Sequence, residues 1–402
     1  MKDLLFLAHR IPYPPNKGDK IRSWNILRHL AERYRVHLGC FVDDPDDWRH
    51  LDTVREICGE CHFEKLEPTK AKIKSLASLV RREPMTLGYY RNREMNAWIS
   101  NISERHDMQG VFVFSSSMAQ YAIDGRFGSA PVVIDFVDVD SDKWAQYAQK
   151  KAVPEKWIYA REARTLGDYE RLAAASATAS IFVSEAEATL FRSLAPASAE
   201  KIFGINNGVD FDFFNPETQY PDPFEGANDA LVFTGAMDYW ANAEAVGWFA
   251  EDVFPRIRDR CATARFWIVG SNPSPEVQKL AKLPGVTVTG RVADVRPFIA
   301  HAAAVVAPLR VARGIQNKVL EAMAMAKAVV ATPQALDGID AEPGRDLVVA
   351  SEPEPFAASV AELVAGTARD DMGRRARERV KAGYGWQSNL SPLNAILESP
   401  GV

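Results

Sequence analysis

Short runs of apolar residues alternate with segments of helical periodicity along almost the whole chain. The runs are apolar throughout rather than alternating with polar residues, which is typical of parallel strands covered by helices on both faces. The order strand, helix, strand first occurs at residues 3–8, 21–30 and 35–41, and this predicts a βαβ unit. Further strands are predicted at residues 111–114, 132–137, 180–183, 201–205, 230–234, 265–269, 285–289, 303–307, 328–332 and 347–349.

Prolines concentrate in one segment near the middle of the chain. Residues 209–229 contain three of them, a composition typical of an interdomain linker. The length of 402 residues suits two or three domains. We therefore predict an α/β protein with two Rossmann-like domains facing across a cleft, at residues 1–208 and 230–385, and a helix within residues 386–402.

Composition and charge exclude several classes of protein. Hydrophobic residues make up 47% and charged residues 25%, unlike disordered, collagen-like or coiled-coil chains. The net charge of −5 provides no basic field, so we expect no nucleic-acid partner. The first apolar run, Leu4–Ala8, is too short for a signal peptide, and no stretch approaches the roughly 20 apolar residues of a transmembrane helix. We expect a cytoplasmic protein, with attachment to a membrane surface left open.

Two of the four cysteines fall in the sequence Cys58-Gly-Glu-Cys61-His62. This spacing matches c-type haem attachment, but that reaction takes place after export, which we do not expect here. As half of a zinc site, the segment lacks a second Cys/His pair nearby. We therefore predict free thiols, with neither haem nor metal.

The segment from Pro308 to Ala326 is the most informative for function. It is predicted as the end of a strand, a loop, and a helix that Gly314 opens, and the free amides at a helix N-terminus favour anions. Lys318 adds a full positive charge one turn further on, and Glu321 follows on the same side of the helix. A cation for a diphosphate and a carboxylate for a ribose diol suit a nucleotide. The alternative is a surface helix with an ordinary ion pair.

Around this segment the chain resembles the family 4 glycosyltransferases, which have the GT-B fold. The similarity is carried first by Gly314–Ala326 and Ala328–Pro333, and it extends over nearly the whole chain. Other phrases similar to the family are Pro14–Arg22, Val183–Glu187, Asn206–Asp210, Phe233–Gly235, Phe266–Gly270 and Val288–Gly290. Three segments resemble a bacterial subgroup of this family that is associated with exopolysaccharide and exosortase (PEP-CTERM) systems. They are Pro14–Arg22, Asp138–Trp144 and Arg313–Glu321.

The resemblance implies an enzyme that transfers a sugar, with retention at the anomeric carbon, from a nucleotide sugar of the UDP or GDP type. The C-terminal domain would bind this donor and the N-terminal domain a glycan or polyprenyl-linked acceptor, with the last helix packed back on the N-terminal domain. GT-B enzymes need no bound metal, so neither a metal nor a cofactor is expected. The alternatives are another GT-B activity, such as a nucleotide-sugar epimerase or a phosphorylase, and a catalytically degenerate scaffold that binds glycan or lipid.

The same resemblance assigns the donor-binding residues. Glu321 matches the second glutamate of the family signature, which binds the ribose hydroxyls, whereas Arg313 replaces the first. The family often has a lysine shortly after the glycine that corresponds to Gly235, and this chain has none there. Nearby cations are therefore expected to neutralise the leaving diphosphate. The predicted donor-binding residues are Gly18, Gly235, Arg291, Arg310, Arg313, Gly314, Ile315, Gln316, Lys318 and Glu321.

Two aspartates are candidates for catalysis on the acceptor side. Gly18 matches the loop that approaches the donor diphosphate, and Asp19 beside it is either an acceptor-side catalytic residue or a helix N-cap. Asp138 belongs to an acidic cluster after the strand predicted at 132–137, and ligands bind at the carboxyl ends of such strands. We predict that Asp138 contacts the acceptor; the alternative is a solvated acidic loop. The pair Asp138 and Asp140 also fits a metal-dependent GT-A transferase, which the two-domain layout disfavours.

The segment Lys65–Arg93 contains eight lysines and arginines and only two acidic residues. Leu76, Leu79 and Val80 interleave with these cations, as in a basic amphipathic helix that lies on a membrane surface. The pattern predicts peripheral contact with an anionic membrane on its cytoplasmic side. The alternative is an ordinary solvated helix.

Overall fold

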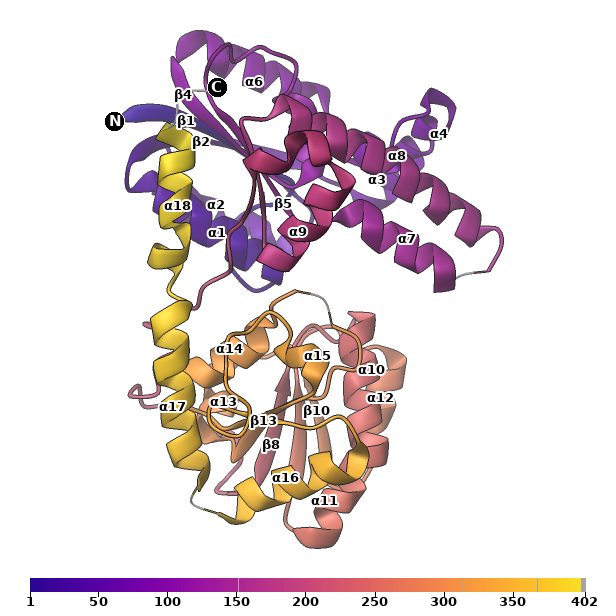
Figure 1. Ribbon diagram of the computed structural model, residues 1–402, viewed down its shortest axis with the longest axis vertical. Helices are drawn as coiled ribbons and strands as arrows, with labels where there is room; N and C mark the ends of the chain where they lie inside the picture. The colour runs from indigo at the N-terminus through magenta and orange to yellow at the C-terminus, as the bar shows by residue number, and fades with distance from the viewer. Residues whose placement is uncertain (151, 313, 367, 399–402) are drawn as a thin grey trace. The chain divides into compact units, whose positions relative to one another are not determined.

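The computed structural model describes residues 1–150, 152–312, 314–366 and 368–398. The chain forms two compact units, one of Met1–Asn206 with Leu390–Val402 and one of Asn207–Asn389. Helix α18 (Trp386–Glu398) begins in the second unit, and from Leu390 onward it belongs to the first. Each unit is an α/β domain built on a parallel sheet (Figure 1), which confirms the predicted fold class.

The first unit contains a seven-stranded sheet in the order β3-β2-β1-β4-β5-β6-β7. In its centre Leu5 pairs with His37 on one side and with Val111 on the other. The side chains of Leu4–Ala8 are fully buried, as expected for a strand covered on both faces. The order of the strands reverses between β1 and β4, and open α/β sheets bind ligands at such a switch point. The strands are β1 (Lys2–Ala8), β2 (Tyr34–Val42), β3 (Cys61–Lys65), β4 (Met108–Phe114), β5 (Val132–Val137), β6 (Ala179–Phe182) and β7 (Ile202–Gly204).

A buried ion pair fixes the first helix of this unit to the sheet. Arg22 Nε lies 2.7 Å from Asp135 Oδ2 in β5, and Arg22 Nη1 donates a hydrogen bond to the carbonyl of Ile205 at 2.8 Å. The start of this helix is thereby held at the carboxyl ends of the strands. The helices are α1 (Gly18–Ala31), α2 (Leu51–Arg55), α3 (Pro68–Ser75), α4 (Ala77–Arg81), α5 (Met85–Tyr90), α6 (Arg93–Arg105), α7 (Asp140–Lys150), α8 (Glu155–Ser176) and α9 (Glu185–Leu194).

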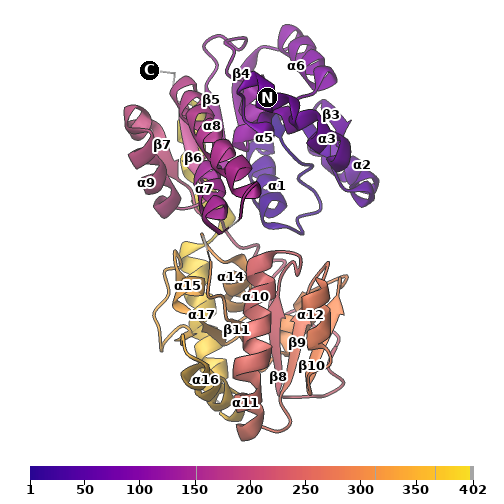
Figure 2. The same cartoon turned by 90° about the vertical axis from the view of Figure 1, so that its right-hand side faces the viewer.

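The second unit contains a six-stranded sheet in the order β10-β9-β8-β11-β12-β13, with its switch point between β8 and β11. Figure 2 shows β10, β9, β8 and β11 side by side in this order. Its strands are β8 (Ala230–Thr234), β9 (Arg265–Val269), β10 (Val286–Gly290), β11 (Ala304–Ala307), β12 (Val329–Ala331) and β13 (Val348–Val349). Its helices are α10 (Trp240–Trp248), α11 (Phe254–Arg260), α12 (Pro275–Leu280), α13 (Arg296–His301), α14 (Asn317–Ala324), α15 (Pro333–Leu336), α16 (Pro353–Ala365) and α17 (Ala368–Gly383).

Every strand predicted from the sequence is present, with ends that differ by at most three residues. One strand, β3, was not predicted, because its residues are polar or only half-buried and give no apolar run. Within the parts of the chain that the structure describes, no helix is both long enough and apolar enough to span a bilayer.

Candidate active site

The loop after β11 leads into the helix that carries the predicted donor residues. Helix α14 begins at Asn317 rather than at Gly314, so the predicted start is wrong. Gly314 has a φ of 66°, a left-handed value that suits glycine but does not occur within an α-helix. The side chain of Gln316 donates a hydrogen bond to the carbonyl of Gly314 at 2.9 Å. Ile315 is 8% exposed and packs in the core, so its side chain supports the turn.

Lys318 lies in the first turn of α14, where its ammonium group is enclosed. Nζ donates a hydrogen bond to Asn242 Oδ1 at 2.6 Å and lies 4.7 Å from the centre of the Phe233 ring. Burial lowers the pKa of Lys318 to about 8, against the attraction of Glu321. Burial also raises the pKa of Glu321 to about 7, against the attraction of Lys318. A cation and a carboxylate one turn apart on one helix therefore both titrate near neutral pH.

Asn242, in α10, is a site residue that the sequence reasoning did not identify. It is 6% exposed, and its Nδ2 donates to the carbonyl of Ala236 at 2.9 Å, which leaves Oδ1 to accept from Lys318. A Cβ on Gly235 would lie 2.7 Å from Asn242 Nδ2, so this close approach requires glycine. In the sequence, Asn242 is a single polar residue in an otherwise largely apolar helix. The apolar pattern alone does not show whether such a residue is buried or lies on the surface.

The three arginines predicted for the donor site differ in their positions and contacts. Arg310 Nη1 lies 3.5 Å from a Glu244 carboxylate oxygen, and its guanidinium lies 5.7 Å from the centre of the Trp248 ring. Arg291 is exposed and follows β10, which is three strand spacings, or about 14 Å, across the sheet from β11. Its place at the donor site therefore stays a prediction. Arg313 lies outside the described residues.

In the first unit, Asp19 belongs to an ion-pair cluster at the carboxyl end of β1. It is the second residue of α1, whose N-cap is Lys17, so the N-cap alternative is wrong. Asp19 Oδ2 lies 2.5 Å from Arg10 Nη1 and 3.4 Å from His9 Nε2. Although burial opposes ionisation, His9 and Arg10 hold the pKa of Asp19 well below its ordinary value. Beside it, Gly18 has no atom of a described residue within 4 Å of the position that a Cβ would take, which leaves its backbone approachable.

Asp138 follows β5 and is paired rather than solvated. Lys143 Nζ lies 2.6 Å from Asp138 Oδ2 and 3.3 Å from Asp140 Oδ1, and the Asp138 side chain is 22% exposed. The alternative of a solvated acidic loop is therefore wrong. The preceding residue, Val137, has a φ of 67°, a strained value for a β-branched residue, and its N–H donates to Asp135 Oδ1 at 2.9 Å. Strain of this kind at a strand end is typical of functional sites.

A carboxyl group that we did not predict from the sequence lies next to the cluster of Asp138, Asp140 and Lys143. Glu170, in α8, accepts hydrogen bonds from the Ser141 hydroxyl at 2.5 Å and from the Ser141 N–H at 3.3 Å. Burial and the charge of Asp140 raise the pKa of Glu170 to about 8. Glu170 is therefore mostly protonated at neutral pH, and its buried position between two helices gave no signal in the sequence.

One group of side chains has the composition of a metal site. Asp3, His37 and His106 lie close together at the amino ends of the first sheet. However, Asp3 is held by Arg35 through two hydrogen bonds of 2.5 and 2.8 Å. His37 Nδ1 accepts a hydrogen bond from the N–H of Glu60. A histidine that binds a metal through Nε2 normally carries a proton on Nδ1 and donates it to an acceptor, so this arrangement is the reverse of the usual one. The group is therefore an ion-pair network with poor ligand geometry.

One part of the second unit matches a known protein family. Residues 228–366 match the model of a family described as "Glycosyl transferases group 1". A search of curated protein sequences gave no significant match.

Solved structures similar to the chain include Anabaena Alr3699/HepE in complex with UDP and glucose, with 15% identity, 99% coverage of both chains and a TM-score of 0.66. A glycosyltransferase from Rickettsia africae has 13% identity, 99% coverage of both chains and a TM-score of 0.68. Sucrose-phosphate synthase from Thermosynechococcus elongatus has 15% identity, 98% coverage of both chains and a TM-score of 0.65. These similarities show the GT-B fold, and with the matched domain they make the chain a glycosyltransferase.

Proposed function

We propose that this glycosyltransferase moves a sugar, with retention at the anomeric carbon, from a UDP- or GDP-type nucleotide sugar to a glycan or polyprenyl-linked acceptor. The observation that carries the proposal is the pair of enclosed groups on α14. Lys318 offers a cation to the diphosphate, and Glu321, one turn further on, offers a carboxylate to the ribose hydroxyls. The Anabaena relative has been solved with UDP and with UDP-glucose, which favours a uridine nucleotide.

The proposed reaction rests on charge stabilisation by the protein. As the bond between the anomeric carbon and the diphosphate breaks, negative charge develops on the leaving oxygen, and Lys318 is placed to neutralise it. Arg310 and Arg313 follow the same strand and are the further cations in this proposal. The departing diphosphate takes the acceptor proton, so no protein nucleophile is needed. Neither a metal nor another cofactor enters this scheme.

On the acceptor side we assign the two paired aspartates different roles. Asp138 pairs with Lys143 and retains some exposure, so it suits a hydrogen bond from an acceptor hydroxyl. Asp19 is held by Arg10 and His9, so its part is to fix these two side chains at the end of β1. The resemblance at Pro14–Arg22 and Asp138–Trp144 supports a place in exopolysaccharide synthesis.

The basic segment predicted as a membrane surface forms α3, α4 and α5. The apolar residues that interleave with its cations are exposed: Leu76 is 51%, Leu79 38% and Val80 88% exposed. Helix α8 contributes a second exposed apolar group beside them, because Arg161 Nη2 donates to the carbonyls of Ser78 and Glu83 at 3.0 and 3.1 Å. One turn before Arg161, Trp157 is 81% exposed. The exposed apolar residues of the two groups are Ile73, Leu76, Leu79, Val80, Val153, Trp157 and Ile158.

This surface supports peripheral attachment to the inner face of the cytoplasmic membrane. Apolar side chains with this exposure gain free energy by entering the interface, and the cations around them are attracted to anionic lipids by about 1 kcal/mol each. Trp157 suits such a position because its ring is apolar while its N–H stays near the headgroups. Attachment here would bring a polyprenyl-linked acceptor to the first unit.

Binding and turnover of UDP-glucose test the proposed reaction. Lys318→Met should lower kcat more than it raises KM for the donor, because the charge it neutralises is greatest in the transition state. Lys282→Met removes an exposed charge from the same unit and should change neither constant. A change confined to KM would contradict the catalytic role of Lys318. Conversion of the donor without an acceptor would indicate an epimerase, and nucleotide binding without turnover a degenerate scaffold.

Vesicle flotation tests the membrane surface. With anionic lipids we expect binding that weakens in high salt, and a residual salt-resistant part that Trp157→Ser reduces. Leu172→Ser is the matched control, because Leu172 is 57% exposed on the same helix but far from α4. Equal binding to neutral and anionic vesicles, or none to either, would reject the electrostatic attachment.

A further inference from the structure

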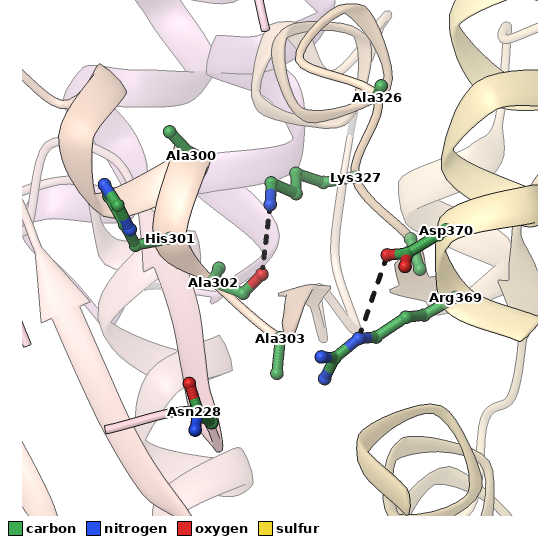
Figure 3. Close-up of a pocket in the computed structure, with 10 residues that line it drawn as sticks. Asn228, Ala300, His301, Ala302, Ala303, Ala326, Lys327, Arg369 and Asp370 are labelled. Carbon is green, nitrogen blue, oxygen red and sulfur yellow. Dashed lines mark hydrogen bonds and ion pairs between the residues drawn. The ribbon is translucent and has the colours of Figure 1, made fainter. Parts of the chain in front are cut away.

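A cavity of about 200 Å³ opens in the second unit (Figure 3). It is formed by the turn from α13 to β11, the turn from α14 to β12, and the first turn of α17. The polar side chains that line it are Asn228, His301, Lys327, Arg369 and Asp370.

The cavity is separate from the donor residues. Its walls precede β11 and β12, whereas Lys318 lies beyond the carboxyl end of β11. A strand of the length of β11, Ala304–Ala307, spans about 13 Å. The cavity therefore lies at the amino ends of these strands, whereas Lys318 lies at the carboxyl ends.

Lys327 carries a charge into this cavity with little compensation from the protein. Within the described part of the chain, the hydrogen bond of its Nζ is a long contact of 3.4 Å to the carbonyl of Ala302. Burial lowers the pKa of Lys327, against the attraction of Asp370. An ammonium group that has lost part of its hydration is costly unless an anion or several hydrogen bonds replace the water.

Arg369 adds a second cation from α17. Its Nε lies 3.9 Å from Asp370 Oδ1, which is too long for a hydrogen bond, and the Asp370 side chain is 78% exposed to water. His301 Nε2 lies 2.9 Å from the carbonyl of Tyr220, so that nitrogen donates away from the cavity. Figure 3 shows the side chains of Lys327 and Arg369 reaching toward the same space from different elements. Two cations thus face one carboxylate that is largely hydrated.

We propose that this cavity is an anion site that binds a phosphate group between Lys327 and Arg369. A guanidinium presents paired N–H donors that match a phosphate, and an ammonium adds a point charge from the other side. The volume admits inorganic phosphate or a small phosphomonoester. Such an anion supplies the charge and the hydrogen bonds that Lys327 lacks.

Calorimetric titration of the full chain tests this site, first with inorganic phosphate and then with glucose 1-phosphate. We expect Lys327→Met and Arg369→Met each to weaken binding by about tenfold or more, since each removes a charged hydrogen bond. Lys327→Arg keeps the charge and should retain binding. Lys282→Met, which removes an exposed lysine of the same unit, should leave the affinity unchanged. Equal affinity for the two ligands indicates a site for the phosphate group alone, and tighter binding of glucose 1-phosphate indicates a phosphomonoester site.

Two results would overturn the proposal. One is the absence of binding to the wild-type chain at millimolar ligand. The other is binding that Lys318→Met abolishes and Lys327→Met leaves intact, because the phosphate would then occupy the start of α14. Thermal melts without ligand separate these effects from folding, since Lys327 also bonds the end of α13 and its loss can lower stability alone.

Discussion

The enclosed pair on α14 predicts that nucleotide binding depends on pH in a bell shape. The carboxyl group of Glu321 has a pKa raised to about 7, so below this value it takes up a proton and becomes a poorer acceptor for ribose hydroxyls. The ammonium group of Lys318 has a pKa lowered to about 8, so above this value it loses its charge. Binding of UDP should therefore be tightest between pH 7 and pH 8.

The two pKa values set the size of the effect. The fraction of protein with Glu321 ionised and Lys318 protonated is about 0.6 at pH 7.5, and it falls to about 0.1 at pH 6 and at pH 9. If this form binds UDP, the affinity falls about sixfold on either side, or about 1 kcal/mol. Glu321→Gln should remove the acidic limb and lower the affinity at pH 7.5 by about 10- to 100-fold, the equivalent of one charged hydrogen bond.

Isothermal titration calorimetry with UDP from pH 6 to pH 9 measures both limbs. The terminal phosphate of UDP also titrates near pH 6, but this contribution is common to all variants and cancels in their affinity ratios. Lys318→Met should remove the alkaline limb, and Glu251→Gln, at an exposed position of the same unit, should leave both limbs in place. A flat profile for the wild-type chain, or an unchanged acidic limb in Glu321→Gln, would refute the assignment.

Three further predictions concern the groups that support these sites. Asn242→Ala removes the acceptor that holds Lys318 Nζ at 2.6 Å, so the alkaline limb of UDP binding should move about one pH unit lower, as calorimetry would show. Because burial raises the pKa of Glu170 to about 8, the folded state binds an extra proton from about pH 4.5 to 8, and stability should fall as pH rises through this window. Urea unfolding should show a slope of up to about 1.4 kcal/mol per pH unit, and Glu170→Gln should flatten it. Gly208→Ala should destabilise the second unit by about 1–3 kcal/mol in the same assay, because a Cβ there would lie 2.5 Å from the backbone nitrogen of Trp386.

The fold was accessible from the sequence because its signals are local. A run such as residues 303–307 is apolar at every position, and this requires cover on both faces wherever the strand lies in the sheet. The alternation of such runs with helices then leaves few topologies other than a parallel sheet. Strand β3 (Cys61–Lys65) was not predicted because it lies at the edge of the sheet. An edge strand forms the same backbone hydrogen bonds to its one neighbour, but its side chains are only half-buried and can be polar, so it gives no apolar run in the sequence.

The start of α14 was predicted too early for a related reason. The anion-binding pattern of glycine, lysine and glutamate is visible along the chain, but a helix cannot include the left-handed φ of Gly314. Sequence spacing indicates which residues share a helix face. It does not report the backbone angle at which the helix begins.

The sequence by itself determined the two parallel α/β domains and the position of Lys318 and Glu321 on one helix, because both follow from periodicity over a few residues. Tertiary structure alone decided which groups face these side chains and therefore how they titrate. Asn242 reaches Lys318 across 76 positions of the chain, and Arg22 meets Asp135 across 113. Burial and the pairing of charges depend on such distant contacts, and these two factors set the pKa values and the unmet charge of Lys327.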